Sequence, residues 1–251
     1  MTGFRDTFPG PRLDLSVWTP AYLPAWSSRM AAAATYRLVG DGLVLTIPDE
    51  HPVWCPELHE PPLRVSAVQS GNWSGPVGST AGQQPFLDGQ TVREQQPESR
   101  GFVPLRGRIE VECRATLGPR SMFSAWMIGM EDRPERCGEI CLVEVFGDAV
   151  DGDTAAVGNG LHAFRDPNLH EEFSADRRTI DVAALHRYAV DWRPDGVDFL
   201  IDDEIVRRSA QSPAYPMLLI LGVFDFPDRA VPGVPDPVPE LVVRSVTGTP
   251  R

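Results

Sequence analysis

Two glutamates, Glu139 and Glu144, lie five residues apart in a short segment that alternates like a β-strand. The segment spans residues 137–147 and reads Cys-Gly-Glu-Ile-Cys-Leu-Val-Glu-Val-Phe-Gly. Two carboxyl groups held about 5–5.5 Å apart can act as a nucleophile and an acid/base on the same bond, which is the chemistry of retaining glycosidases. The spacing makes this pair the first candidate for a catalytic site.

Strict alternation along a strand would separate the two glutamates. It places Glu139 and Cys141 on one face and Glu144 on the other, among hydrophobic residues. An unpaired carboxylate in a protein core is strongly unfavourable or stays protonated. One extra residue in a β-bulge near residues 142–143 returns Glu144 to the face of Glu139, so we predict a bulge there. On the pattern alone, an exposed strand face with two solvated glutamates remains the alternative.

The elements that must position this pair are short strands and turns. The 22 glycines and 25 prolines are spread along the chain, which is typical of strands joined by turns. Period-two alternation predicts a hairpin in which Tyr188 and Trp192 face the core, and residues 181–185 are the one short helix candidate. We predict a single all-β domain over residues 1–251, a sandwich of two antiparallel sheets. The predicted strands cover residues 42–47, 107–116, 186–192, 197–201, 204–207, 216–224 and 240–246.

Residues 49–99 are the least regular part of the sequence and are rich in Pro, Gly, Gln and Ser. A stretch of this length inside a compact domain is usually functional, so we predict loops that line a binding cleft, with disorder as the alternative. Trp54 and Trp73 lie within it, and Trp26 lies just before it. Each of the three could stack on a sugar or be structural.

The charge of the chain limits its partners. A net charge of −12, with no Lys/Arg-rich run, argues against nucleic acid and anionic membrane surfaces. A neutral polysaccharide or oligosaccharide is compatible with this charge, and we expect a monomer. The sequence contains no apolar stretch of 18 residues, so we expect no membrane span. No signal peptide is evident, so the default expectation is a cytoplasmic protein.

Four cysteines, Cys55, Cys113, Cys137 and Cys141, lack the spacing of a metal site. Along an extended strand, the pair nearest in sequence is too far apart for a disulfide. We therefore expect four free thiols, no metal site and no cofactor.

Residues 139–144, Glu-Ile-Cys-Leu-Val-Glu, resemble the signature Glu-x-Asp-x-x-Glu of glycoside hydrolase family 16, the laminarinase-like enzymes. The resemblance covers nearly the whole chain and implies a concanavalin A-like jelly roll with a concave substrate cleft. The other stretches similar to the family, in the same order, are residues 6–8, 13–18, 107–111, 124–129, 186–196 and 216–221.

This resemblance also implies roles for single residues. Glu139 would be the nucleophile and Glu144 the general acid/base, in the bulged spacing that the family's β-1,3-glucanases show. Trp126 would line the cleft as a sugar platform, with a core tryptophan as the alternative. His162 resembles a histidine on the strand after the catalytic one, where a sugar contact and a structural role are equally open. Trp73 is a weaker candidate for sugar binding.

Three departures from the family pattern stand out. Cys141 replaces the middle Asp of the signature, Arg106 stands where an aromatic residue is usual, and residues 241–244 lack the family's tyrosines. In the family the middle Asp orients the nucleophile. A thiol between two carboxylates should stay protonated and donates only a weak hydrogen bond, so Glu139 would be held less firmly. The lost negative charge should also lower the pKa of Glu144.

Three functions follow from these observations. The first is a retaining endo-β-glucan hydrolase of the β-1,3-glucanase type. The second is a carbohydrate-binding protein on the same fold, with catalysis weakened by Cys141. The third is a transglycosylase, in which a sugar instead of water receives the glycosyl group.

Overall fold

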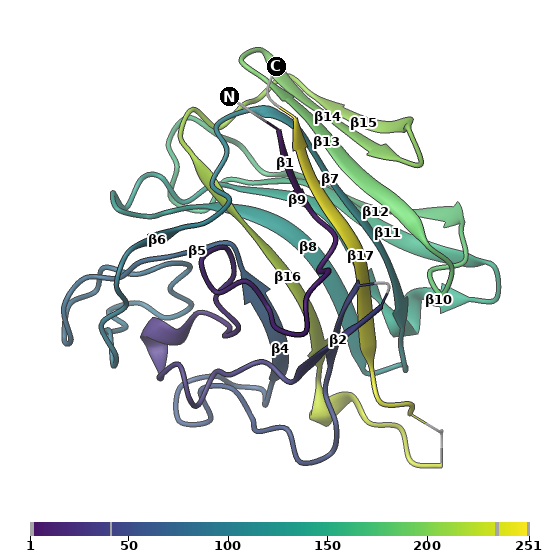
Figure 1. The fold of residues 1–251 in the computed structure, drawn as a ribbon, viewed down its shortest axis with the longest axis horizontal. Helices are drawn as coiled ribbons and strands as arrows, with labels where there is room; N and C mark the ends of the chain where they lie inside the picture. Colours follow the sequence, from purple (N-terminus) through teal and green to yellow (C-terminus); the bar gives the residue numbers. More distant parts are fainter. Residues whose placement is uncertain (1–2, 41, 234–235, 250–251) are drawn as a thin grey trace.

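Two antiparallel β-sheets packed face to face form the body of the computed structural model, which describes residues 3–40, 42–233 and 236–249 (Figure 1). One sheet has eight strands in the order β15-β14-β13-β7-β17-β3-β2, with β1 paired to β17. Its strands are β1 (Phe4–Asp6), β2 (Tyr36–Val39), β3 (Gly42–Thr46), β7 (Gly107–Thr116), β13 (His186–Arg193), β14 (Gly196–Ile201), β15 (Glu204–Ser209) and β17 (Glu240–Thr249).

A second sheet has seven strands in the order β10-β11-β9-β8-β16-β4, with β12 paired to β11. Its strands are β4 (Arg64–Gln69), β8 (Ser121–Gly129), β9 (Glu139–Phe146), β10 (Val150–Asp151), β11 (Thr154–His162), β12 (Glu172–Thr179) and β16 (Met217–Asp225). The remaining elements are the pair β5 (Gly71–Asn72) and β6 (Ser99–Arg100), and the 3₁₀ turns η1 (Pro24–Trp26), η2 (Gly147–Ala149) and η3 (Pro227–Arg229). The predicted all-β jelly-roll sandwich is confirmed.

Alternating side chains of both sheets meet between them and form the main hydrophobic core. Tyr188 and Trp192 of β13 are almost completely buried there, as their alternation predicts. A second hydrophobic cluster lies on the outer face of the seven-stranded sheet, beneath loops. Both faces of this sheet are therefore covered, and only part of the outer face is left open for a site.

Residues 49–99 form these covering loops, and they also contain a strand that the sequence pattern did not predict. β4 pairs with β16 at the edge of the seven-stranded sheet, and all six of its residues are buried. Each face of β4 carries both polar and apolar residues, because loops cover one face and the core covers the other, so its pattern lacks one consistently apolar face.

The short helix expected at residues 181–185 is not formed. The segment makes a single turn, in which the amide of Ala184 donates to the carbonyl of Asp181. The carboxylate of Asp181 accepts a hydrogen bond from the amide of Ala183. This local bond favours a turn over a continuing helix.

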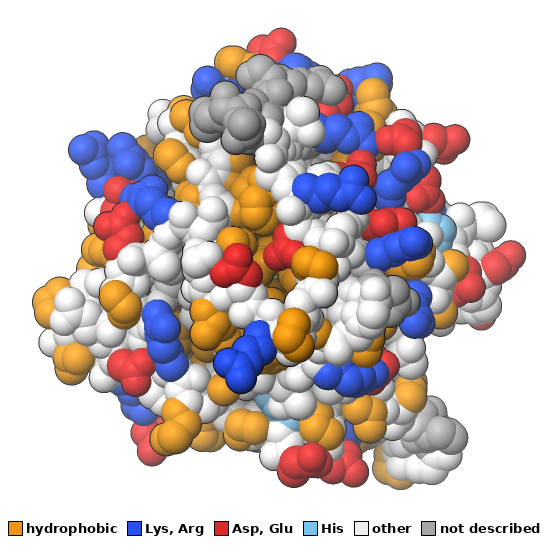
Figure 2. Space-filling model, viewed as in Figure 1, with side chains coloured by type: hydrophobic (Ala, Val, Ile, Leu, Met, Phe, Trp, Pro, Cys, Tyr) orange, Lys and Arg blue, Asp and Glu red, His pale blue; other side chains and the backbone are white. Residues whose placement is uncertain are grey.

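Strand β1, near the start of the chain, pairs with β17, near its end, and the two strands lie side by side in Figure 1. On the face drawn in Figure 2, basic side chains are interspersed with acidic ones, and no continuous basic patch covers it. Among the described residues no helix has the length and hydropathy of a membrane span.

Candidate active site

A bulge interrupts the pairing of β9 with both of its neighbours. Val143 pairs with Ala125 of β8, but the next pairing along the strand joins Cys141 to Trp126, so Leu142 is the extra residue. The pairing with β11 shifts at the same place. The bulge that the sequence predicted near residues 142–143 is present.

The bulge has the predicted effect on side-chain direction. Leu142 and Val143 both pack into the main core, although they are neighbours in sequence. Cys141 belongs to the cluster on the outer face, and Glu139 and Glu144 both line a hollow on that face. The fold therefore brings the two glutamates to one site.

This hollow, the candidate catalytic hollow, has a volume of about 180 Å³. Strands β8, β9 and β16 form its floor, and loops at Tyr22 and Gln84 form its wall. The residues that line it are Tyr22, Gln84, Met122, Ser124, Trp126, Glu139, Glu144 and Phe224.

Glu139 lies at the first position of β9 and is only 8% exposed. Its Oε2 accepts a hydrogen bond from the side-chain amide of Gln84 at 2.8 Å, and its Oε1 lies 3.8 Å from Nε2 of His162. Burial, with a smaller contribution from the charge of Glu144, raises the pKa of Glu139 from 4.5 to about 8. The hollow thus favours a protonated carboxyl group at neutral pH.

Glu144 is partly buried, and burial also raises its pKa, while the charge of His162 opposes this rise. His162 lies at the end of β11, opposite Glu139. Its Nδ1 is 2.6 Å from Oε1 of Glu171, and its ring stacks on Phe173 at 4.5 Å. The imidazole is therefore fixed beside both glutamates, with a carboxylate partner on its far side.

The thiol of Cys141 lies on the face between the two glutamates and is 1% exposed. Its sulfur is 3.9 Å from the hydroxyl oxygen of Ser124, which donates to the carbonyl of Val143 at 2.9 Å. Burial and the two neighbouring glutamates hold the pKa of this thiol well above its usual range. All four cysteines are buried free thiols, as expected.

Gln84 is the site residue that sequence reasoning missed. It lies in the loops of residues 49–99, far from the motif in sequence, and it lines the catalytic hollow. Its side-chain oxygen accepts a hydrogen bond from the indole N–H of Trp126 at 3.4 Å, and its amide nitrogen donates to Glu139. No signature of spacing or residue type marks such a loop residue.

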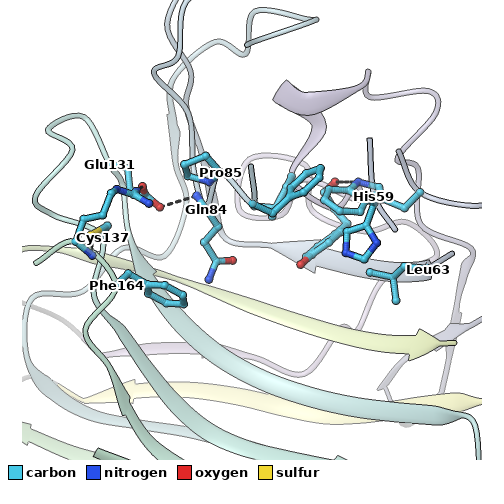
Figure 3. A pocket seen from close by; sticks show the side chains of 12 residues that line it. His59, Leu63, Gln84, Pro85, Glu131, Cys137 and Phe164 are labelled. Carbon is cyan, nitrogen blue, oxygen red and sulfur yellow. Dashed lines mark hydrogen bonds and ion pairs between the residues drawn. The ribbon is translucent and has the colours of Figure 1, made fainter. Parts of the chain in front are cut away.

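A second hollow of about 230 Å³ continues from the first, and the two share Tyr22 and Gln84. Figure 3 shows Glu131, Cys137 and Phe164 on one side of it and His59 and Leu63 on the other, with Gln84 and Pro85 between them. Its full lining is Tyr22, Leu23, Trp54, His59, Leu63, Gln84, Pro85, Phe86, Glu131, Cys137, Phe164 and Arg165.

One end of this second hollow is polar. Glu131 is 4% exposed and accepts hydrogen bonds from the backbone amide of Gln84 at 2.6 Å and from Arg165 at 2.5 Å. Burial raises the pKa of Glu131 to about 7, although both donors oppose the rise. The rest of the lining is largely aromatic, a composition that suits the faces of sugar rings.

The tryptophans proposed as sugar contacts occupy different positions. Trp126 lines the catalytic hollow and is only 5% exposed. Trp54 is buried in the wall of the second hollow, and Trp73 packs on the outer cluster without lining either hollow. Trp26 is completely buried and is structural. No group of three or more metal-binding side chains occurs among the described residues.

Comparison with known protein families identifies the family of this chain. Residues 102–229 match the model of glycosyl hydrolases family 16. The chain belongs to this family. The match includes β9 with both glutamates and the hairpin of β13 and β14.

Solved structures of family 16 type resemble this chain over almost its full length. The GlcNAcα1-4Gal-releasing endo-β-galactosidase from Clostridium perfringens is 28% identical with a TM-score of 0.80. The match covers 98% of this chain and 61% of that one, so this chain spans less than two thirds of its length.

Two more distant structures share the jelly-roll fold. The laminarinase from Flavobacterium sp. UMI-01 is 17% identical with a TM-score of 0.64, covering 98% of both chains. The Crh5 transglycosylase is 16% identical with a TM-score of 0.63, covering all of this chain and 85% of that one. A comparison with curated proteins gives no match.

Proposed function

We propose that this family 16 protein is a retaining endo-glycosidase, with Glu139 as nucleophile and Glu144 as general acid/base. The observation that carries the proposal is the bulge in β9, which places both carboxyl groups on the floor of one hollow. A retaining glycosidase needs two carboxyl groups close enough to act on the same anomeric carbon.

In the proposed first step, Glu144 donates its proton to the glycosidic oxygen while the carboxylate of Glu139 attacks the anomeric carbon. The bond to the leaving oxygen breaks, and a glycosyl ester of Glu139 forms. In the second step Glu144 takes a proton from water, the water oxygen attacks the anomeric carbon, and the ester bond breaks. Both glutamates return to their starting states.

This mechanism needs one proton on the pair, and it needs that proton on Glu144. Burial raises the pKa of both carboxyl groups, so the hollow disfavours two negative charges at neutral pH. The N–H group that Gln84 presents to Glu139 favours the state in which Glu139 carries the charge. A hydrogen bond from a bound sugar would add to the same effect.

For the substrate, we propose a β-linked galactose-containing glycan. One support is the 28% identity to the endo-β-galactosidase over nearly the whole of this chain. The other is the net charge of −12, with which a neutral glycan is compatible. A β-1,3-glucan is the second candidate, because the bulged motif resembles that of the family's β-1,3-glucanases.

The variant Glu139→Gln tests the nucleophile. We expect turnover of the best substrate from a panel of β-galactans, galactose-containing oligosaccharides and β-glucans to fall on the order of 10³-fold or more. Folding and glycan affinity should be nearly unchanged, because Gln keeps the shape but cannot form the ester. For the wild-type protein, NMR of the first product should show retention of the anomeric configuration.

A matched control is Glu204→Gln, which changes an exposed glutamate at the start of β15 and should leave turnover unchanged. Wild-type turnover in Glu139→Gln, or inversion at the anomeric carbon, would contradict the proposal. Binding of glycans by the wild-type protein without turnover would favour the carbohydrate-binding function. Products longer than the substrate would favour transglycosylation.

A further inference from the structure

We propose that Gln84 is the positioning residue of the nucleophile: its side-chain amide holds and orients Glu139, in place of the carboxylate that Cys141 replaces. This inference deepens the function proposed above and rests on it. The hydrogen bond from Gln84 Nε2 to Glu139 Oε2 is 2.8 Å long, whereas the thiol of Cys141 has its contact with Ser124. The orienting contact thus comes from a loop on the opposite wall of the hollow.

Trp126 decides which end of the Gln84 amide faces Glu139. An indole N–H can only donate, so it turns the amide oxygen toward itself. The NH₂ group then points at Glu139 and can only donate to it. A donor facing a carboxyl group stabilises its ionised form, which is the form that a nucleophile needs.

The backbone of Gln84 is also fixed by its neighbours. Its φ angle is +44°, in the left-handed region. The following Pro85 disfavours the α-helical region for Gln84. The buried carboxylate of Glu131 accepts the backbone N–H of Gln84 at 2.6 Å and is itself anchored by Arg165 (Figure 3). Strain of this kind persists only where surrounding contacts impose it, and it is typical of functional sites.

The charged and titratable groups around Glu139 make this donor important. The charges of Glu144 and Glu171 raise the pKa of Glu139, and the charge of Glu139 in turn raises the pKa values of Cys141 and Tyr22. Among the described groups named below, His162 alone can carry a positive charge. The groups that face Glu139 are Glu144 and Cys141 on β9, His162 on β11, Glu171 before β12, and Tyr22 in the wall.

The variant Gln84→Met tests the proposal, because it keeps the length of the side chain and removes the donor. We expect kcat to fall by about 10²-fold, the scale of a misplaced catalytic group, with little change in KM. The acid-side inflection of the pH profile of kcat/KM should move to higher pH, because Glu139 loses a hydrogen bond to its ionised form.

Gln90→Met is the matched control in the same loop. The side chain of Gln90 accepts hydrogen bonds from the amides of Phe86 and Leu87, at 2.9 and 3.3 Å, and does not line the catalytic hollow. This variant should lower stability without moving the pH profile. An equal pH shift in both variants, or none in Gln84→Met, would overturn the proposal.

Trp126→Phe gives a second test, which also serves if Gln84→Met does not fold. It removes the indole N–H and lets the amide rotate, so it should shift the pH profile in the same direction by a smaller amount. The double variant should show less than the sum of the two effects, because both act through one hydrogen bond. Full additivity would contradict a coupled path of hydrogen bonds from Trp126 through Gln84 to Glu139.

A readout without turnover separates this inference from the proposed function. If no glycan is hydrolysed, the endo-glycosidase proposal fails, but the pH dependence of the melting temperature still reports the pKa of Glu139. In Gln84→Met the loss of stability with rising pH should extend to higher pH than in the wild-type protein. The same curve in both proteins would overturn the role of Gln84.

Discussion

Cys141 occupies the position where the family signature has its middle Asp, between Glu139 and Glu144 on β9. From the sequence, this replacement suggests a weakened nucleophile. The structure shows a buried thiol whose neighbouring hydroxyl, that of Ser124, already donates to a backbone carbonyl. The surroundings of Cys141 therefore suit a neutral side chain.

We accordingly expect Cys141→Asp to destabilise the protein and not to raise its turnover. A buried carboxyl group at this position would add a third acid to the pair, and Ser124 could give it a hydrogen bond only by releasing Val143. The cost should be about 1–3 kcal/mol, measured by chemical denaturation.

The control Cys141→Ser keeps a neutral, polar side chain of similar size and should cost less. Turnover measured against pH completes the test. A rise in kcat for Cys141→Asp, with the basic limb of the profile moved upward, would mean that Cys141 is a damaged Asp. Gln84 would then be an incomplete substitute for it.

At the scale of elements, the bulge in β9 and the loops over the seven-stranded sheet have different tasks. The bulge sets the direction of both glutamates within one strand. The loops build the second hollow, whose lining includes four non-glycine residues with positive φ: Leu23, Gln84, Glu131 and Phe164. Backbone held in this region favours a preorganised binding site over a passive connection.

We predict that the second hollow binds a sugar unit next to the bond that is cleaved. Phe164 is 58% exposed and lines this hollow, so its ring is open to a ligand. In the Glu139→Gln background, Phe164→Ala should weaken binding of oligosaccharides by about 1 kcal/mol, or roughly fivefold in Kd, by calorimetry.

The matched control for this prediction is Val77→Ala, which truncates a side chain that is 65% exposed and lines neither hollow. Short aryl glycosides that do not reach the second hollow should be bound equally by all variants. Equal affinity of Phe164→Ala and its parent for long oligosaccharides would place the sugar elsewhere.

At the scale of the whole molecule, three glutamates couple stability to pH: Glu139 and Glu131, which are buried, and Glu144, which is partly buried. The pKa values of Glu139 and Glu131 are raised by burial to about 8 and about 7, and that of Glu144 is raised as well. In each case the folded state binds protons more tightly than the unfolded chain. Stability therefore falls as the pH rises from the ordinary carboxyl range, near 4.5, toward the folded-state values.

We expect the melting temperature of the wild-type protein to fall between pH 5 and pH 8, a window set by these pKa shifts. Glu139→Gln should flatten the curve, because it removes the group whose pKa is raised to about 8, whereas the exposed control Glu204→Gln should not. Parallel curves for the wild-type protein and Glu139→Gln would show that folding does not raise the pKa of Glu139.

The sequence by itself predicted the sandwich, most of its strands, the core positions of Tyr188 and Trp192, and the bulge between Cys141 and Glu144. These features depend on period-two alternation and on the cost of burying a carboxylate, both of which act within one strand. They can be read locally, without knowing what packs against the strand.

Only the tertiary structure decided what surrounds the pair. β4, the wall at Tyr22 and the contact from Gln84 lie in loops whose conformation depends on packing against a sheet built from distant strands. Trp126 has the residue type of an open sugar platform, but its neighbours bury the ring and turn its N–H toward Gln84. Burial and hydrogen-bond partners are properties of the assembled fold, because they arise between segments far apart in the chain.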